Sequence, residues 1–304
     1  MRLRVRSLKT KKFINNRFDI FAACYGADNR DKKPEFRAFA KQLIARLPWG
    51  IRKIVAFLGN HGPVNLLLSK SSFVGIYRSF TDVPQAPRQN TQFLVKSAVL
   101  NLAAQKFDDA TGLPILRNSH SLLPLTASML FGRNPIRILD VGGAGGVDFA
   151  NLLNAAPQLS NIEYRVIDLP DVCELGRGRW ENDQRISFAS SMPSEDRTFD
   201  LIFSSWAIQY FAQPLQLLEK LTAYQAKAIL LINVSFTTKR AFVRVQANKM
   251  IPSWVLNLPD LEQMMADRGY SLAFHVAGDV DHNVDNYPPE YRVSNLANLL
   301  FLKS

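Results

Sequence analysis

Residues 137–148, which read RILDVGGAGGVD, constrain the fold of this 304-residue chain more than any other stretch. Residues 138–141 form a short apolar run around Asp140, as is typical of a buried parallel strand. Four glycines follow within five positions, and apolar residues then recur at helical spacing through residues 147–153. Small residues let a ligand approach the backbone, and the start of a helix offers free N–H groups and partial positive charge. The stretch therefore predicts a strand, a glycine turn and a helix that together form a nucleotide-type site.

A second acidic residue, Asp168, follows the next predicted strand at residues 164–167. It lies 28 residues after Asp140, which is the length of a glycine turn, a crossover helix and a return strand. A carboxylate at the tip of that strand can accept hydrogen bonds from a ribose diol. Dinucleotide-binding enzymes carry G-x-G-x-x-G with an acid about 20 residues further on. The order here is D-x-G-G-x-G-G with a longer gap. This pattern resembles the first motif of the Rossmann-like S-adenosylmethionine-dependent methyltransferases and makes a dinucleotide the second choice.

Strands and helices alternate along the rest of the chain. Further strands are predicted at residues 186–189, 200–204, 228–234, 271–276 and 297–302, and helices at 90–107, 121–130, 215–221 and 259–268. Such alternation predicts an α/β fold with a doubly wound, mostly parallel sheet. By resemblance to methyltransferases, the last strand is expected to be antiparallel. We therefore predict a Rossmann-like methyltransferase sheet preceded by a helical N-terminal cap. Its parts are a basic, partly amphipathic segment at 1–70, the cap at 71–134 and an S-adenosylmethionine-binding domain at 135–304.

Several further motifs make residues 70–304 similar to a family of methyltransferases from bacterial surface-polysaccharide loci. They are F-x-G-x-Y-x-S-F at 73–80, Arg117, LDVGGAGG, RVIDLPDV, SSWAIQYF, Val245-Gln246, IPSW at 251–254 and Gly269-Tyr270. The chain departs from the family pattern at two places. Ala144 replaces the middle glycine, which requires a negative φ at this position. The position after the fifth strand, which often carries a charge in this family, reads Asn233-Val234-Ser235.

The resemblance implies S-adenosylmethionine as cofactor and O-methylation of a sugar or glycan precursor in surface-polysaccharide biosynthesis. It assigns residues to the parts of the site as follows: Asp140, Gly142, Gly143, Ala144 and Gly146 around the methionine part of the donor, Asp168 and Leu169 at the ribose, Ser191 and Met192 at the adenine, Ser205, Trp206, Gln209 and Tyr210 near the transferred methyl, and Tyr77 and Arg117 as lid or substrate residues.

Some of these residues also have structural interpretations. Asp140 can anchor the glycine turn, Asp168 can cap the helix that starts at Pro170, and Trp206 and Tyr210 can be core residues. None of the four histidines has a partner at a diagnostic spacing, so no catalytic base is assigned. His282 lies in the sequence DVDHNVD, which we interpret as a solvated loop. A catalytically degenerate binding module with the same fold remains an alternative, because Ala144, Ser191 and the absent base all favour it.

The net charge of +11 lies entirely in the N-terminal segment. Residues 1–53 contain 15 basic and 4 acidic residues, whereas the remainder contains 22 of each. Basic residues beside an amphipathic stretch could dock residues 1–60 on an anionic membrane, where a lipid-linked glycan acceptor would lie. The favoured interpretation is a solvated arm followed by helices that pack on the core, and nucleic acid is disfavoured because base-stacking aromatic residues are not interleaved. Two distant cysteines and no signal peptide predict a cytoplasmic protein without a metal site.

Overall fold

The computed structural model describes residues 72–83, 118–159, 161–246 and 251–304. All of them belong to one compact unit, Ala56–Ser304. The predicted N-terminal segment at 1–70, the helix at 90–107 and Arg117 lie outside the described residues. In the part of the chain that is described, no helix is long and apolar enough to cross a membrane.

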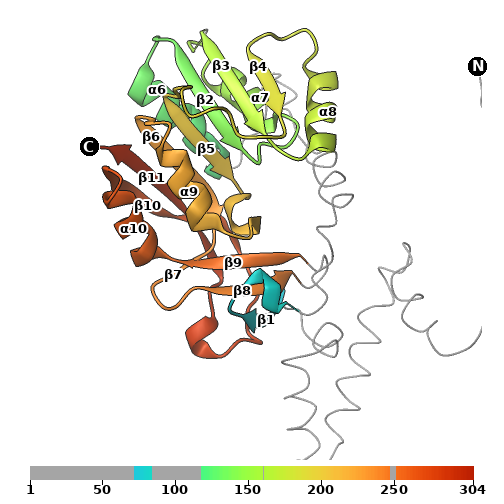
Figure 1. Cartoon of the computed structure of the whole chain (residues 1–304), viewed down its shortest axis with the longest axis vertical. Coiled ribbons are helices and arrows are strands. Elements are labelled where there is room, and N and C mark those ends of the chain that lie inside the picture. The colour runs from blue at the N-terminus through green and yellow to red at the C-terminus, as the bar shows by residue number, and fades with distance from the viewer. Residues whose placement is uncertain (1–71, 84–117, 160, 247–250) are drawn as a thin grey trace, which may run out of the picture. The chain divides into compact units, whose positions relative to one another are not determined.

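A seven-stranded sheet forms the centre of the unit, with the strand order β10-β11-β6-β5-β2-β3-β4 (Figure 1). Its strands are β2 (Ile136–Val141), β3 (Ile162–Ile167), β4 (Ile186–Ala189), β5 (Leu201–Ser205), β6 (Ala228–Val234), β10 (Tyr270–Asp281) and β11 (Asn295–Lys303). The strands β2 to β6 pair in parallel, and β11 pairs antiparallel with both β6 and β10. The predicted fold class is therefore confirmed, including the antiparallel last strand.

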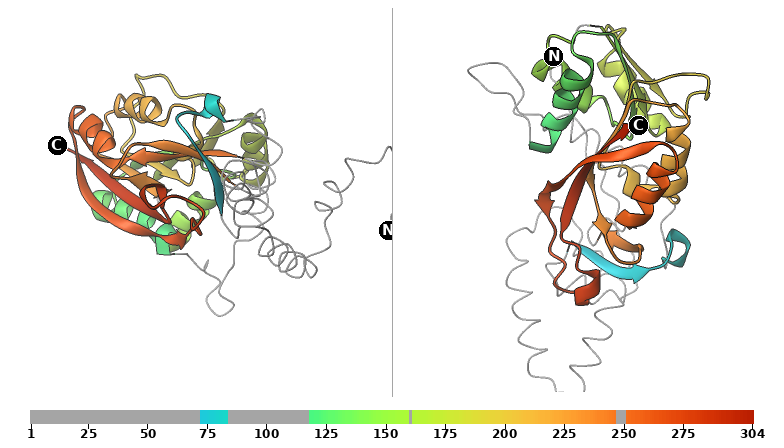
Figure 2. Two further views of the ribbon diagram at one scale, coloured as in Figure 1. Left: turned by 90° about the horizontal axis from the view of Figure 1, so that it is seen from below. Right: turned by 90° about the vertical axis from the view of Figure 1, so that its left-hand side faces the viewer.

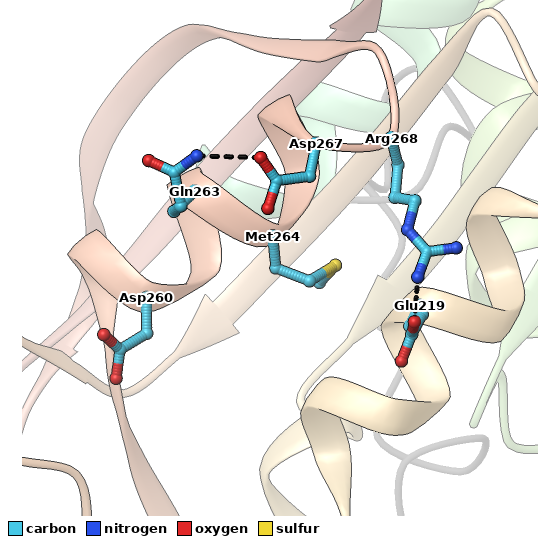
Figure 3. Close-up of a pocket in the computed structure, with 6 residues that line it drawn as sticks. All are labelled: Glu219, Asp260, Gln263, Met264, Asp267 and Arg268. Carbon is cyan, nitrogen blue, oxygen red and sulfur yellow. Dashed lines mark hydrogen bonds and ion pairs between the residues drawn. The ribbon is translucent and has the colours of Figure 1, made fainter.

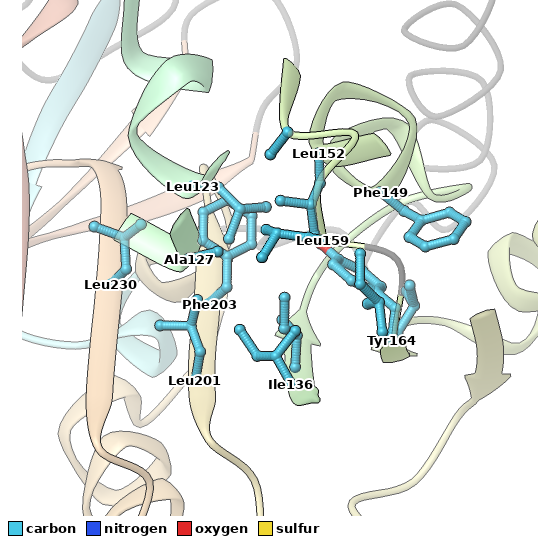
Figure 4. Packing of buried hydrophobic residues seen from close by; sticks show 14 of the residues in the cluster. Leu123, Ala127, Ile136, Phe149, Leu152, Leu159, Tyr164, Leu201, Phe203 and Leu230 are labelled. Atoms are coloured by element: carbon cyan, nitrogen blue, oxygen red, sulfur yellow. The ribbon is translucent and has the colours of Figure 1, made fainter. Parts of the chain in front are cut away.

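Helices cover both faces of this sheet, as the right-hand view of Figure 2 shows. The helices α6 (Leu122–Phe131), α7 (Val147–Ala155) and α8 (Pro170–Arg179) contribute to the core on one face, and α9 (Pro214–Thr222) and α10 (Leu258–Ala266) contribute to the core on the other. Successive strand residues point to opposite faces. Leu201 and Phe203 accordingly join the first core, whereas Ile202 between them joins the second. Figure 4 shows the first core, where Phe203 packs near Leu123 of α6.

A second, four-stranded sheet was not predicted from the sequence. It has the order β1-β8-β9-β7 and consists of β1 (Phe73–Tyr77), β7 (Phe236–Thr237), β8 (Phe242–Gln246) and β9 (Pro252–Asn257). The strand β9 contacts the 3-10 helix η3 (Ile208–Tyr210), which follows β5, and Trp254 Nε1 donates to the carbonyl of Ala212 over 3.1 Å. The small sheet therefore lies at the carboxyl ends of the central strands, below the central sheet in Figure 1.

Among its described residues, the predicted helical cap is only partly helical. Residues 122–131 form α6, close to the prediction, and it is preceded by the 3-10 helix η2 (Asn118–Ser121). Residues 73–77, in contrast, form strand β1, which pairs antiparallel with β8, and the 3-10 turn η1 (Phe80–Asp82) follows. The register of this pairing shifts between Val74 and Tyr77, around Gly75 with its φ of 73°. This bulge interrupts the alternation by which a strand is recognised in a sequence.

Candidate active site

Backbone strain gathers at the carboxyl edge of the central sheet. Three of the four described non-glycine residues with positive φ lie there: Ala144 (51°) after β2, Trp206 (59°) after β5, and Asn233 (55°) near the end of β6. The strands β2, β5 and β6 are neighbours in the sheet. Residues other than glycine rarely adopt a positive φ, and those that do cluster at ligand sites. Open α/β sheets bind their ligands at this same edge.

The glycine turn packs too closely for side chains. Gly142 has a φ of 77°, and its N–H donates to the carbonyl of Ile167 over 2.8 Å. A Cβ atom on Gly142 would lie 2.2 Å from Cβ of Ala207, and one on Gly143 would lie 2.1 Å from Oδ2 of Asp140. Ala144 has a φ of 51°, so the negative φ under which alanine would be free of strain at this position is not present. The glycine turn is thus packed against β3 and against the loop after β5. The backbone of Gly142 and Gly143 is not covered by side chains of their own.

Asp168 links the glycine turn to the end of β3. Its Oδ2 accepts the N–H of Ala144 at 2.9 Å, and its Oδ1 accepts the N–H of Leu169 at 2.7 Å. Leu169 is the N-cap residue of α8 and no side chain caps this helix, so the capping role considered for Asp168 is wrong. Burial raises the pKa of Asp168, and these two backbone donors partly oppose the rise. A carboxylate offers about four lone-pair positions, so each oxygen can still accept a hydrogen bond from a ligand.

Asp140 is fully buried directly beneath the turn. Its Oδ2 accepts a hydrogen bond of 2.7 Å from the Tyr164 hydroxyl, whereas its Oδ1 has no partner among the described residues. Burial raises the pKa of Asp140 well above its ordinary value, and the charge of Asp148 adds to the rise. Buried polar atoms nearly always have a partner, so the unsatisfied oxygen points to a missing donor.

A third carboxylate belongs to the same cluster. Asp148 is buried at the start of α7 and accepts a hydrogen bond of 2.8 Å from Nδ1 of His120. Both Asp148 and Asp168 act electrostatically on Asp140. We name Asp140, Asp148 and Asp168 the acidic cradle. Three carboxylates around one turn favour a cationic ligand, and they oppose the pyrophosphate of a dinucleotide. His120 and Asp148 are not recognisable as a pair in the sequence, because 28 residues separate them.

Ser191, Met192 and Leu169 lie next to the acidic cradle. The N–H of Asp168 donates to the carbonyl of Ala189, the last residue of β4, over 3.2 Å, so the residues after β4 begin beside Asp168. Ser191 is exposed and Met192 packs on the second core. The structure therefore places the end of β4, two residues before Ser191, beside the acid assigned by resemblance to the ribose.

The last residue of β5 and the residues that follow it form a polar cluster toward β6. Ser205 Oγ and Gln209 Oε1 are buried without hydrogen-bond partners among the described residues, and Gln209 Nε2 donates to the carbonyl of Asn233 at 3.1 Å. Gln246 Nε2 donates to the Tyr210 hydroxyl at 2.6 Å, and burial raises the pKa of Tyr210 to about 12. Both the acidic cradle and this cluster therefore contain buried polar atoms without hydrogen-bond partners among the described residues: Asp140 Oδ1 in the first, and Ser205 Oγ and Gln209 Oε1 in the second.

The sequence suggested that His282 lies in a solvated loop, but the structure does not agree. His282 is half-buried, with its ring in edge-to-face contact with Phe73 at 4.8 Å and with Trp206 at 6.3 Å between centroids. A histidine therefore lies beside the residues expected near the transferred methyl. Tyr77 lies in the small sheet, where it packs with Val243 and Val245, and not at the glycine turn.

A shallow groove also lies between α9 and α10 (Figure 3). It is lined by Glu219, Asp260, Gln263, Met264, Asp267 and Arg268, and Arg268 forms an ion pair with Glu219. None of the residues predicted for the site lines this groove, so we do not assign a function to it.

Comparison with known proteins agrees with this arrangement. The methyltransferase-domain family matches residues 116–273. Among solved structures, a protein described as a sarcosine dimethylglycine methyltransferase from Galdieria sulphuraria has a TM-score of 0.51 at 11% identity, covering 70% of this chain and 98% of its own. The 1,6-didemethyltoxoflavin-N1-methyltransferase of Burkholderia thailandensis has a TM-score of 0.47 at 13% identity, with coverages of 78% and 96%. No curated protein matches the chain. The family match spans more than half of the sequence, so the chain belongs to the methyltransferase-domain family, and it shares the fold of the Galdieria sulphuraria methyltransferase.

Proposed function

We propose that the protein transfers a methyl group from S-adenosylmethionine to a hydroxyl group of a sugar or glycan precursor. The observation that carries the reaction type is the acidic cradle around the strained glycine turn. The donor has a sulfonium and an ammonium group, and carboxylates stabilise such cations. The Oδ1 of Asp140, which has no hydrogen-bond partner among the described residues, can accept a hydrogen bond from the ammonium group.

The residues of the turn fit the parts of the donor. Gly142 and Gly143 carry no side chains that would exclude the methionine part. Asp148, and Asp140 once the bound cation favours its ionised form, would lie beside it with negative charge. Asp168 would hold the ribose hydroxyls while its contact with Ala144 keeps the turn in place. Leu169, Ser191 and Met192 would border the adenine. When bound, the donor supplies a methyl group already activated by its positively charged sulfur.

The residues after β5 would position the acceptor. Transfer breaks the sulfur–methyl bond and forms an oxygen–methyl bond, and the hydroxyl proton must go to a base. Trp206 and Tyr210 would exclude water and hold the hydroxyl in line with the methyl, which is where most of the rate gain of such a reaction arises. His282, whose ring contacts Trp206, is the residue that we assign as the base, because imidazole exchanges protons near neutral pH.

The acceptor class rests on the motifs shared with the polysaccharide-locus methyltransferases, which include the strand β1. A lipid-linked glycan acceptor would place the enzyme at the inner face of the membrane, with residues 1–60 as its contact to anionic lipids and the catalytic domain in the cytoplasm. This membrane location is independent of the reaction type, because the glycine turn and the acidic cradle lie outside residues 1–60.

One observation favours a second candidate, a binding module without catalysis. Both oxygens of Asp168 already accept backbone N–H groups, and Ala144 is strained where the family has glycine. Such a protein would bind the donor weakly and transfer nothing. A dinucleotide-binding oxidoreductase is disfavoured by the charge of the acidic cradle.

Three measurements test the proposal. Calorimetry should show binding of S-adenosylmethionine and S-adenosylhomocysteine by the full chain and no binding of NAD. Incubation with the donor and a panel of sugar nucleotides and glycolipids should then release S-adenosylhomocysteine. Binding without release on any acceptor supports the binding module, and binding of NAD alone supports the oxidoreductase. In a deletion strain, mass spectrometry of surface glycans should show the loss of one methyl group, or about 14 mass units.

A further inference from the structure

A fully buried arginine lies on the acceptor side of the site. Arg244, in the middle of β8, has no solvent exposure. Its terminal nitrogens donate to the Oγ of Ser235 at 2.9 Å and to the carbonyl of Val293 at 2.7 Å, and its guanidinium carbon lies 3.7 Å from the centre of the Phe73 ring. Its Nε has no hydrogen-bond partner among the described residues.

The charge of Arg244 has no described counter-ion. Among the side chains that the structure describes, no carboxylate lies within 4 Å of the guanidinium. Burial lowers the pKa of Arg244 to about 10, so the group still carries its charge at neutral pH. A buried charge without an ionic partner is strongly unfavourable, and neutral acceptors compensate it only in part. A guanidinium has five N–H donors, so the two bonds to Ser235 and Val293 leave donors to spare.

Arg244 is connected to the residues expected around the transferred methyl. Residues two apart on a strand point to the same side, so Arg244 and Gln246 share a face of β8. Gln246 donates to the hydroxyl of Tyr210, and Tyr210 and Arg244 interact electrostatically. Ser235 directly follows β6, where the resembling family often carries a charged residue and this chain does not. Arg244 thus brings a positive charge to that place from another strand.

We infer that Arg244 binds an anionic group of the methyl acceptor, either a carboxylate or a phosphate. The inference rests on the proposed function and narrows its substrate class. Nε and a neighbouring terminal nitrogen form an edge that can donate to two oxygens of one anion, which is the geometry that arginine offers and lysine does not. The site would then be divided by charge, with the cationic donor at the acidic cradle and the anionic acceptor at Arg244. Since the carbonyl of Val293 covers the guanidinium, residues 282–294 would shift when the acceptor enters.

The alternative is that Arg244 has only a structural role. Its hydrogen bonds to Val293 and Ser235 would then hold residues 282–294 against the end of β6. Both interpretations predict that loss of the side chain lowers stability, so stability alone does not separate them. The two interpretations differ in what they predict for the binding of small anions. If Arg244 binds an anion, its replacement weakens anion binding; if Arg244 is purely structural, its replacement leaves anion binding unchanged.

The test titrates the full chain, saturated with S-adenosylhomocysteine, with inorganic phosphate, glucuronate and glucose at constant ionic strength, and follows binding by calorimetry and by thermal shift. Wild type should bind phosphate or glucuronate, and which of the two binds identifies the anion, while neutral glucose alone should bind far more weakly. R244Q, and R244K as the variant that keeps the charge, should bind the anion about ten- to a hundredfold more weakly. The control variant R197Q, which alters an exposed arginine beside Glu163, should bind as wild type does.

Each outcome bears on one claim. Failure of wild type to bind S-adenosylhomocysteine would contradict the proposed function and leave the anion-binding role of Arg244 to be judged on the unsaturated protein. If S-adenosylhomocysteine binds, then anion binding that is absent in wild type, or equal in wild type and R244K, overturns the inference. Because R244K retains the positive charge, it serves as the deciding variant if R244Q does not fold.

Discussion

The backbone N–H of Ala144 donates to Oδ2 of Asp168 over 2.9 Å, which ties the left-handed residue of the glycine turn to the acid at the end of β3. One carboxylate therefore has two tasks in the proposed site, since it shapes the turn and holds a ribose. Substitution of either residue should affect the other task as well.

Replacement of Asp168 should weaken donor binding. D168A removes a charged acceptor, and such hydrogen bonds contribute about 1.5–3 kcal/mol, which corresponds to about 10- to 150-fold in affinity. D168N keeps one oxygen for the N–H of Ala144 but loses the charge, so it should fold better than D168A and still bind weakly. Calorimetry with S-adenosylmethionine measures both, and D171N on the exposed first turn of α8 is the control. Wild-type affinity in folded D168A would contradict the ribose assignment.

Replacement of Gly142 by valine should abolish donor binding. The new Cβ would meet Ala207 at 2.2 Å, and the left-handed backbone would strain the side chain besides. The matched control is G132V, because Gly132 also has positive φ but a Cβ atom added there would have open space within 4 Å. G132V should lose about 1–3 kcal/mol of stability through backbone strain alone and keep its donor affinity. Donor affinity and thermal denaturation of the two variants provide the comparison, and equal affinities would show that the turn is only structural.

Donor binding should depend on pH through Asp140. Because the pKa of Asp140 is raised, its carboxyl group in the folded protein without donor stays protonated at pH values where an ordinary aspartate is ionised. Stability from the protonated form is therefore present at low pH and is lost as the pH rises through the folded pKa. A cationic donor favours the ionised form, so binding should release protons and strengthen with rising pH in this window. Calorimetry in buffers of different ionisation enthalpy detects the release. D140N should show no such release, and an unchanged release in that variant would exclude Asp140 as its source.

Replacement of His282 should slow the reaction without weakening the donor. A general base contributes about 10²- to 10⁴-fold to rate, so H282A should lower kcat by this amount. His275 is exposed on β10, and H275A is the control. An H282A enzyme that keeps the wild-type kcat would show that His282 only packs against Trp206.

The basic N-terminal segment should bind anionic membranes if the proposed location is correct. Each Lys or Arg near such a surface contributes about 1 kcal/mol, and the screening length at 0.15 M salt is about 8 Å. The full chain should therefore sediment with anionic vesicles at low salt, be released at high salt, and ignore neutral vesicles. Deletion of residues 1–60 should remove the binding and leave donor affinity intact. Equal sedimentation of both forms would exclude the membrane role, and an insoluble truncated protein would favour packing of this segment on the core.

The sequence was sufficient to predict the central sheet, because its signals are local. Each buried strand is a short apolar run, and the strands at 186–189 and 228–234 have the predicted bounds. The glycine turn and Asp168 were recognisable because a bare backbone at a strand end requires residues of those types at that spacing. Placing them at one sheet edge then followed from the parallel topology.

The acceptor side was not predictable, because it depends on distant pairing. The strand β1 is stabilised by β8, which lies far along the chain, and its bulge at Gly75 hides the alternation. His282 reads as part of an acidic loop and becomes a partner of Trp206 only in the folded protein. Arg244 looks in the sequence like any surface arginine, since nothing local indicates that its strand is covered on both sides.

The pairing of β1 with β8 also sets the order in which the protein can mature on the ribosome. About 170 residues separate the two strands, so at a synthesis rate of roughly 5–20 residues per second β1 waits about ten to thirty seconds for its partner. The glycine turn and the strands β2 to β5 are complete before then, and local contacts form faster than distant ones. A nascent chain should therefore acquire its donor half first, and it should become able to recognise an acceptor only near the end of translation.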